Sequence, residues 1–220
     1  MSQLIFKFPF KTKYFEQDFY VSSNNFSVYK LIEEWPNWPN KWLNIYGVSG
    51  SGKTHLSKIL EKKIGKVKII NAENINDSTI TSLEKFECII IDNFKNNVDQ
   101  KILFSLLNQS KQLEKFILVN SEIPLKQMKF KIVDLKSRIE SFLFMGIELP
   151  TDDLLQVIIT KLFSDKQVKL DPKISSYIIK NVERSYDKMF KFLKDVDELS
   201  LSSGKSININ LIKKVLENNE

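Results

Sequence analysis

The chain has 220 residues, of which 42% are hydrophobic and 27% are charged, and its formal net charge is +6. This size and composition predict a globular protein that buries a substantial core, as one large domain or as a domain with a smaller unit. One cysteine and one histidine leave no basis for a disulfide framework or a structural zinc site.

No run approaches the roughly 18 consecutive apolar residues of a membrane helix, so we expect a cytoplasmic protein with no membrane partner. The positive charge is almost entirely lysine, because only Arg138 and Arg184 are arginines among the 33 basic residues. Scattered lysines favour solvated helix faces over a dedicated nucleic-acid surface. In this background, an arginine within a site indicates that a planar, bidentate cation is needed there.

The chain opens with MSQLIFKFPF, an apolar and aromatic run. Lys7 and Pro9 interrupt it and no small-residue cleavage site follows, which argues against a targeting signal. Two alternatives stay open from the residues alone. The run is either an edge strand, which β-branched and aromatic residues favour, or an extended peptide that binds a groove of another protein.

The strongest local motif is YGVSGSGKTHL at residues 46–56, which has the spacing G-x-x-x-x-G-K-T. The strand-like sequence WLNIY precedes it, and an amphipathic helix follows it with one apolar face, formed by Leu56, Ile59, Leu60 and Ile64. Strand, glycine loop and helix in this order predict a phosphate-binding loop, because backbone N–H groups converge on phosphates at the helix N-terminus. In such a loop Lys53 reaches the β and γ oxygens and Thr54 binds Mg²⁺.

The segment ECIIIDN at residues 87–93 supplies the second acid that a phosphate loop of this class needs. Its unbroken apolar run indicates a central parallel strand, and Asp92 lies at the carboxyl end, where ligands bind in open α/β sheets. The alternative for Asp92 is a helix or turn cap. Asn93 stands where nucleotide-hydrolysing relatives carry a second carboxylate, and an amide cannot accept a proton from water. We therefore expect tight nucleotide binding with weak intrinsic ATPase activity.

The rest of the first half continues the α/β alternation. Strands are predicted at 67–72 and 115–120, and helices at 77–86 and 98–113. The second of these strands ends in Asn120-Ser121, polar groups that either sense a γ-phosphate or serve loop chemistry. A loop, a short helix that carries Arg138 and a final strand at 142–149 follow.

After Pro150 the pattern becomes all-helical. Thr151 with the two following aspartates marks a helix start, and Asp171-Pro172 marks a second. A third helix is predicted from about Tyr186 to Ser202, with a last short helix after an extended SININ. Pro150 is therefore the predicted boundary between a nucleotide domain and a helical lid.

These features together resemble the AAA+ initiator family of bacterial DnaA: a phosphate loop reading GKTHL, a strand ending in aspartate, a polar strand end, the box VDLKSR (133–138) and a helical lid. The resemblance covers nearly the whole chain and is strongest to the family's short, Hda-type regulators. It implies an α/β AAA+ P-loop NTPase with a parallel five-stranded sheet between helices and a small all-helical lid. The implied parts are a clamp-binding segment (1–10), the AAA+ domain (11–150) and the lid (151–220).

The resemblance also implies partners. Hda-type proteins begin with a clamp-binding motif, Q-L-x-[LF]-x-[LF], which is matched here by Gln3, Leu4, Phe6 and Phe8. Such proteins bind the DNA polymerase sliding clamp and contribute an arginine in trans to ATP on DnaA, and Arg138 is the matching arginine finger. DNA is then contacted only through the clamp, and homo-oligomer formation is left open. The alternative for Arg138 is a surface or helix-capping ion pair.

The implied ligand is ADP or ATP with Mg²⁺, and the metal ligands are Thr54 and Asp92. The segment 19–25 is expected to form the adenine and ribose pocket. The family's lid sensor falls within SYDKMF (185–190), where either Asp187 or Lys188 takes its place. The complete expected nucleotide-binding set is Gly47, Gly50, Ser51, Gly52, Lys53, Thr54, His55, Asp92, Asn120, Lys188, Tyr20 and Val21.

The predicted function is a nucleotide-binding regulator of chromosomal replication initiation that acts on DnaA. The alternative is a DnaA- or DnaC-like initiation or helicase-loading ATPase, which would stack single-stranded DNA on aromatic residues. Trp35, Trp38 and Trp42 are candidates, although their sequence context favours packing at the start of the first strand. A small P-loop kinase is disfavoured, because a kinase lid usually brings several arginines to the phosphates.

Overall fold

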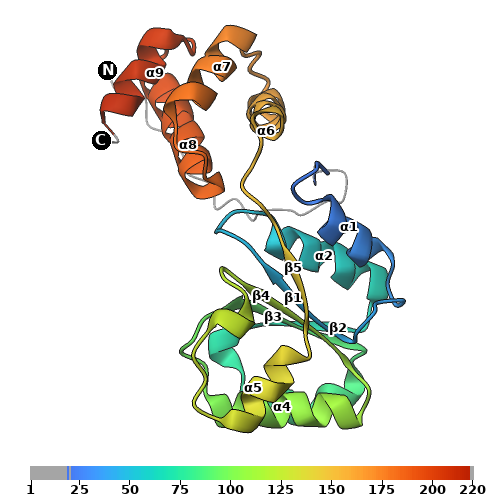
Figure 1. Cartoon of the computed structure of the whole chain (residues 1–220). Helices are drawn as coiled ribbons and strands as arrows, with labels where there is room; N and C mark the ends of the chain where they lie inside the picture. The colour runs from blue at the N-terminus through green and yellow to red at the C-terminus, as the bar shows by residue number, and fades with distance from the viewer. Residues whose placement is uncertain (1–18, 20, 219–220) are drawn as a thin grey trace. The chain divides into compact units, whose positions relative to one another are not determined.

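The computed structural model describes residues 19 and 21–218 (Figure 1). Five predicted site residues lie outside the described residues: Gln3, Leu4, Phe6, Phe8 and Tyr20. The chain divides into two compact units, the first ending at Glu148 and the second beginning at Leu149. No described helix combines the length and the apolar composition that are needed to cross a bilayer.

A parallel sheet of five strands organises the first unit. The strands are β1 (Trp42–Tyr46), β2 (Val67–Asn71), β3 (Cys88–Phe94), β4 (Phe116–Ser121) and β5 (Leu143–Gly146). Their order across the sheet is β2-β3-β4-β1-β5. Because every pair is parallel, the carboxyl ends of the strands meet at one edge of the sheet. The predicted fold class is confirmed.

Helices cover both faces of this sheet (Figure 1). One face carries α1 (Phe26–Glu33) and α2 (Lys53–Ile64), and the other carries α4 (Gln100–Gln112) and α5 (Val133–Glu140). The shorter elements are α3 (Asp77–Thr81) and the 3₁₀ turns η2 (Ala72–Asn74), η3 (Leu83–Lys85) and η4 (Leu125–Gln127).

The predicted helix over 77–86 is shorter than expected, because α3 ends at Thr81 and η3 follows. Thr81 Oγ1 donates to the Ser78 carbonyl at 3.2 Å, and Ser82 Oγ donates to the Thr79 carbonyl at 2.9 Å. Hydroxyl groups that bond nearby carbonyls compete with the regular helix pattern. The run of serines and threonines therefore ends the helix after little more than one turn.

Strand β3 is buried on both faces, which explains its unbroken apolar sequence. Ile89 and Ile91 join the core beneath α4 and α5, whereas Cys88 and Ile90 join the core beneath α1 and α2. All four are at most 1% exposed. Each isoleucine buried in this way contributes about 1.5–3 kcal/mol relative to an exposed side chain.

Cys88 is fully buried in this strand, and burial raises the pKa of its thiol far above the ordinary value. A thiol without thiolate character reacts slowly with electrophiles. We expect no reaction with a disulfide reagent such as DTNB in the native state, and one thiol per chain after denaturation. Rapid reaction of the native chain at neutral pH would contradict this packing.

The second unit is all-helical. It contains α6 (Asp152–Asp165), α7 (Pro172–Asn181), α8 (Tyr186–Ser203) and α9 (Ile209–Glu217). Each helix begins at a capping side chain, which is Thr151, Asp171, Ser185 or Asn208. Gly204 ends α8 at φ +63°, a left-handed conformation that glycine adopts easily. A separate hydrophobic core holds these helices together.

The tryptophans before β1 pack inside the first unit. Trp38 and Trp42 are 7% and 5% exposed, and Trp38 Nε1 donates to the Leu31 carbonyl at 2.7 Å. Trp35 packs on Phe116, with 4.1 Å between ring centroids. These rings are used in the core and do not form a stacking surface for nucleic acid.

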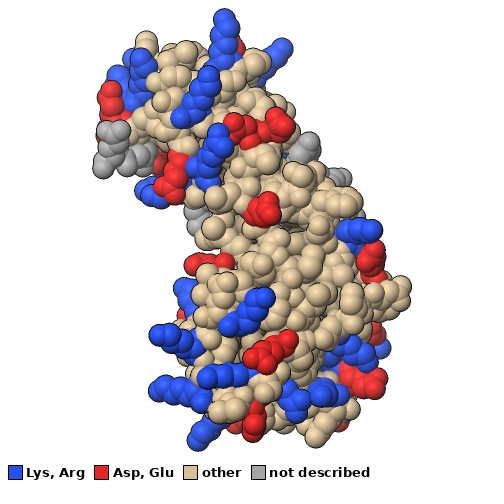
Figure 2. Space-filling view, in the orientation of Figure 1, with Lys and Arg blue, Asp and Glu red and all other residues tan. Residues whose placement is uncertain are grey.

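Lysine and arginine side chains are dispersed over the visible face of both units, with acidic side chains between them (Figure 2). Several lysines form exposed pairs, such as Lys41 with Glu114 at 2.9 Å and Lys58 with Glu61 at 2.9 Å. On this face, the mixed distribution agrees with the interpretation of the positive charge as a compositional feature.

Candidate nucleotide-binding site

The phosphate loop runs from β1 into α2 at the carboxyl edge of the sheet. Gly50 and Gly52 have φ values of +74° and +96°, which glycine tolerates and L side chains rarely adopt. A Cβ atom on Gly52 would lie 2.9 Å from the Phe19 ring, and one on Gly47 would lie 2.8 Å from the Ile147 carbonyl oxygen. The glycines are therefore required by backbone conformation and by close contacts.

Lys53 lies within the curve of this loop. Its Nζ donates to the carbonyl oxygens of Gly47 and Val48 at 2.7 and 2.8 Å, and to Ser51 Oγ at 3.3 Å. Gly52 provides no side-chain cap to the first turn of α2, whose N–H groups carry the positive end of the helix dipole. The loop thus combines an ammonium group with an uncapped helix N-terminus, the arrangement that binds a phosphate.

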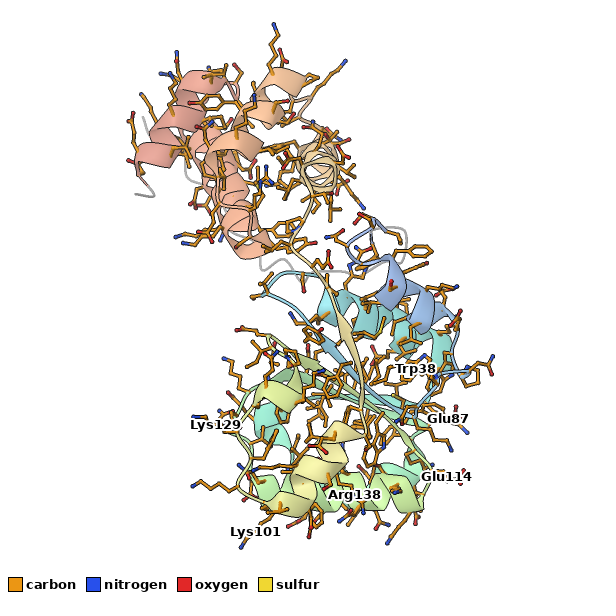
Figure 3. The ribbon with its side chains drawn as sticks, viewed as in Figure 1. Trp38, Glu87, Lys101, Glu114, Lys129 and Arg138 are labelled. Carbon is orange, nitrogen blue, oxygen red and sulfur yellow. The ribbon has the colours of Figure 1, made fainter. Side chains whose placement is uncertain are left out.

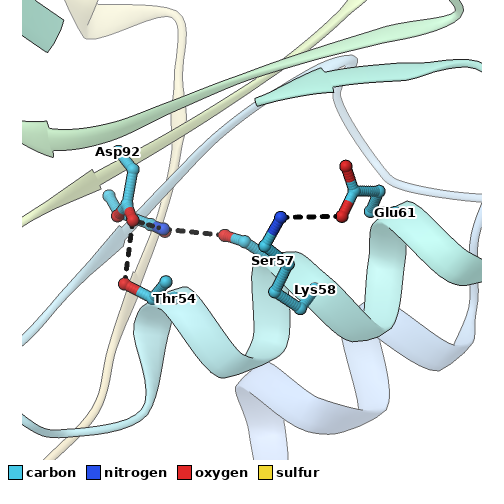
Figure 4. A network of polar contacts seen from close by, with 6 residues as sticks. Thr54, Ser57, Lys58, Glu61 and Asp92 are labelled. Carbon is cyan, nitrogen blue, oxygen red and sulfur yellow. Dashed lines mark hydrogen bonds and ion pairs between the residues drawn. The ribbon is translucent and has the colours of Figure 1, made fainter. Parts of the chain in front are cut away.

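Asp92 connects the end of β3 to the phosphate loop (Figure 4). It is 8% exposed, and its Oδ2 accepts a hydrogen bond from Thr54 Oγ1 at 2.8 Å. Its Oδ1 accepts from the Asn93 backbone N–H at 3.1 Å and from Asn120 Nδ2 at 2.9 Å. The structure therefore brings together three predicted residues from β3, β4 and α2.

Ser57 belongs to the same network, although the sequence analysis did not single it out. It is fully buried on α2, and its Oγ accepts a hydrogen bond from Asn120 Nδ2 at 2.7 Å. It lies three residues after Thr54, so both side chains face the same way along the helix. A polar residue on the buried, otherwise apolar face of this helix was the available signal.

Asn93 adopts a left-handed conformation, with φ +54°, in a β-bulge between the pairs formed by Ile91 and Phe94. Asparagine is among the residues that tolerate this conformation best. Its side chain is exposed, whereas Asp92 before it is buried. The bulge thus places an amide, and not a carboxylate, beside Asp92, the acid predicted to bind the metal.

The segment before α1 lies beside the loop. The Phe19 ring stacks on Tyr29 with a centroid distance of 5.8 Å and meets His55 edge-on at 5.4 Å. Asn24 anchors the segment to the residue after β5, because its Nδ2 donates to the Glu148 carbonyl at 3.3 Å. The half-buried Val21 lies in this segment. The predicted adenine and ribose pocket remains a prediction for these residues.

Arg138 lies near the end of α5, beside α4 (Figure 3). Its Nε donates to Asn108 Oδ1 at 2.9 Å, and its side chain is half-buried. The following Ser141 carbonyl accepts a hydrogen bond from Asn40, which precedes β1, so this end of α5 lies at the amino edge of the sheet. The phosphate loop lies at the carboxyl edge, one five-residue strand or about 16 Å away. Arg138 therefore lies too far to reach the phosphate loop of its own chain.

The guanidinium of Arg138 forms no ion pair with any described carboxylate. The ion-pair alternative therefore finds no partner in the described part of the chain, while the contact with Asn108 gives the side chain a packing role. Arg184, the other arginine, contacts Asp152 at 3.0 Å within the helical unit.

Lys188 lies in the helical unit, on the first turn of α8. Its exposed ammonium is 3.9 Å from Glu183, and its backbone N–H bonds to the capping hydroxyl of Ser185. The side chain of Asp187 lies outside the described part of the chain. The assignment of a lid sensor to either residue stays a prediction.

The residues present fit a nucleotide with magnesium. Thr54 and Asp92 supply one hydroxyl and one carboxylate, which suits Mg²⁺ because this ion is usually held by few protein oxygens together with substrate phosphates and water. Asn120 Oδ1 is a buried acceptor that has no hydrogen-bond partner among the described residues. Such an atom is costly unless a ligand or water donates to it.

Comparison with known proteins gives the family context. Residues 152–216 match the model of the Hda lid domain, and residues 43–133 match a model described as RNA helicase. The second match spans the phosphate loop, Asp92 and Asn120. The chain is also 28% identical, over 99% of its length, to the chromosomal replication initiator protein DnaA of Buchnera aphidicola subsp. Baizongia pistaciae.

The chain is a DnaA-like AAA+ protein with an Hda lid domain. It spans about half the length of the curated DnaA relatives it matches, 53% in the Buchnera protein. An uncharacterized protein of Haemophilus influenzae is 21% identical and is covered over 92% of its length.

Solved structures show the same fold for this DnaA-like protein. Domain III of the Thermotoga maritima initiator DnaA superposes with a TM-score of 0.78 at 19% identity, covering 96% of this chain and 98% of that one. A DnaA structure bound to AMPPCP and single-stranded DNA gives a TM-score of 0.70 at 22% identity, covering 88% of this chain and 67% of that one. At these identities the likeness is one of fold.

Proposed function

We propose that this DnaA-like protein is a nucleotide-binding regulator of replication initiation, which binds the sliding clamp in the cytoplasm and stimulates hydrolysis of ATP bound to DnaA. One observation carries the proposal. Arg138, free of any described carboxylate, stands at the sheet edge opposite the phosphate loop, where a second protein's nucleotide can approach it but its own cannot.

The ligand of its own site is proposed to be ADP or ATP with Mg²⁺. Lys53 and the N-terminus of α2 would hold the phosphates, and Thr54 with Asp92 would hold the metal, which supplies charge neutralisation when bound. Support comes from the DnaA relatives of the same fold whose structures contain AMPPCP. Because Asn93 orients water without accepting a proton, intrinsic turnover is expected to be slow.

The reaction is proposed to occur in the partner. An arginine inserted beside a transferring phosphoryl group stabilises the charge that develops on its oxygens. Arg138 suits this task because its guanidinium carries a delocalised charge in a planar fork, and the hydrogen bond from Nε to Asn108 fixes its direction. The helicase-loader alternative loses its proposed stacking surface, because Trp38 and Trp42 are buried.

Binding to the sliding clamp is the experiment that tests the proposed function. Replacing both Leu4 and Phe6 by alanine should weaken binding to immobilised clamp by about 100-fold or more, since buried anchor residues of this kind contribute about 2 kcal/mol each. Surface plasmon resonance with and without nucleotide measures this. Ile5→Ala, which alternates with the anchors along an extended peptide, is the matched control and should have a small effect.

Nucleotide affinity should be the same in all these variants. Unchanged clamp affinity of the Leu4 and Phe6 variant would instead favour the edge-strand interpretation of residues 1–10 and would reject the clamp as partner.

A further inference from the structure

A surface cavity of about 480 Å³ lies between the segment 126–130, which begins in η4, and the second half of α5. Its volume is within the range of ligand-binding pockets. Three exposed lysines line it, Lys126, Lys129 and Lys136, and Figure 3 shows Lys129 at the surface of the first unit. We call this cavity the lysine groove.

The floor of the lysine groove is apolar. Met128 and Phe130 pack with the core beneath α4 and α5, whereas Lys129 between them is exposed. This alternation is typical of an extended segment, whose successive side chains point to opposite sides. Ile139 of α5 is 2% exposed and completes the floor. The groove therefore presents apolar atoms beneath a rim of ammonium groups.

The charges on this rim are not neutralised within the chain. None of the three lysines lies within ion-pair distance of a carboxylate in the part of the chain that the structure describes. Lys126 Nζ lies 5.0 Å from the centroid of the Phe144 ring, a contact that holds this charge in place. With Glu140, the lining carries a net charge of +2. Like charges gathered in one hollow attract an anionic ligand.

The lining favours an acidic peptide over a nucleic acid. Phe130 is 6% exposed and offers no open face on which a base could stack. Glu140 repels a phosphate backbone, but its carboxylate accepts a hydrogen bond from a peptide N–H group. Met128 has a flexible thioether side chain, which adapts to an aliphatic side chain. A peptide with aliphatic residues between carboxylates therefore matches both the floor and the rim.

We propose that the lysine groove binds a short acidic segment of another protein, with aliphatic side chains on its floor and carboxylates at Lys126, Lys129 and Lys136. Lys136 is about 200° around α5 from Arg138, so the groove and the bond from Arg138 to Asn108 are on opposite sides of this helix. The inference goes beyond the proposed function and does not depend on the nucleotide site.

Fluorescence anisotropy of the full chain with the fluorescein-labelled peptide EDELLDE tests this proposal. The wild type should bind the peptide saturably, with a Kd below about 1 mM. The peptides QNQLLNQ and EDESSDE should each bind about tenfold more weakly, because the first lacks the charges and the second lacks the aliphatic side chains.

Two variants test the rim and the floor separately. The triple variant Lys126→Gln, Lys129→Gln, Lys136→Gln should lower the affinity for EDELLDE about tenfold, because three exposed ion pairs are lost. Met128→Ser should abolish the preference for EDELLDE over EDESSDE. The triple variant should keep the melting temperature of the wild type, since substitutions of exposed side chains have small effects on folding.

The matched control replaces Lys173, Lys180 and Lys191 of the helical unit by glutamine, which removes the same charge from exposed positions. Its affinity for EDELLDE should equal that of the wild type. An equal loss in this control, equal binding of EDELLDE and EDESSDE by the wild type, or no saturable binding of EDELLDE would overturn the proposal. So would labelled single-stranded oligothymidylate that binds the wild type more tightly than EDELLDE and loses affinity in the groove variant, because the groove would then bind nucleic acid.

Discussion

Replacing Arg138 with alanine should abolish stimulation of ATP hydrolysis on DnaA while leaving the chain folded. Removing an arginine finger lowers hydrolysis by about 10³-fold or more, because the metal and the loop lysine alone stabilise the charge that develops on the transferring phosphoryl group less well. Arg138 is suited to this role, since its one described side-chain bond, from Nε to Asn108, leaves the terminal nitrogens to face a partner. Single-turnover hydrolysis of labelled ATP preloaded on DnaA measures the effect.

The chain offers a matched control in its other arginine. Arg184→Ala removes an exposed contact with Asp152 in the helical unit and should leave stimulation unchanged. Arg138→Lys keeps the charge but loses the planar fork, and it should recover only a small part of the activity.

Thermal unfolding of Arg138→Ala distinguishes a loss of catalysis from a loss of packing. The lost bond to Asn108 is worth about 1 kcal/mol, a shift of about 2–4 °C for a chain of this size. Full stimulation by Arg138→Ala, or a loss of activity that merely follows unfolding, would rule out the arginine finger.

Lys53→Ala is expected to weaken binding of both ADP and ATP by about 100-fold or more. The ammonium lies 2.7 and 2.8 Å from two loop carbonyl oxygens, and thus inside the curve that the phosphates would enter. Charge-assisted hydrogen bonds to phosphate are worth about 1.5–3 kcal/mol each, and the variant loses more than one. Calorimetry with ADP and Mg²⁺ provides the measurement.

Lys58→Ala is the control for this variant, because Lys58 lies on the same helix and pairs with Glu61 at the surface. Its nucleotide affinity should equal that of the wild type. Tight ADP binding by Lys53→Ala would mean that the loop is not the phosphate site.

Much of the fold could be predicted because local and long-range signals agree. The glycine loop required a strand before it and a helix after it, and the apolar run of β3 required burial on both faces, which the two cores confirm. The cap residues Thr151 and Asp171 and the C-terminal Gly204 fixed helix ends in the lid, since each has one favoured backbone position.

The misses have physical causes. The expected helix at 77–86 is interrupted because the hydroxyl groups of Thr81 and Ser82 donate to backbone carbonyls. The spacing of apolar residues along the sequence does not predict these hydrogen bonds. The final strand is shorter than the predicted 142–149, covering Leu143–Gly146, because its apolar sequence continues beyond its pairing with β1.

The glycine motif predicted where the site lies, but it did not predict all of the hydrogen bonds among the buried side chains beside it. Asp92, Thr54 and Asn120 are separated in sequence but meet because parallel strands end at one edge. Ser57 was missed because it belongs to no motif; its polar side chain on the buried face of α2 was a weak signal, and the hydrogen bond from Asn120 appears only in the structure. The position of Arg138 at the opposite edge required the path of α5.

The most direct test loads labelled ATP first on this chain and then, in a separate experiment, on DnaA. We expect the purified chain alone to hydrolyse its bound ATP slowly, and ATP preloaded on DnaA to be hydrolysed rapidly when this chain and the DNA-loaded clamp are added. Fast hydrolysis by the isolated chain, with no effect on the ATP held by DnaA, would contradict an action in trans.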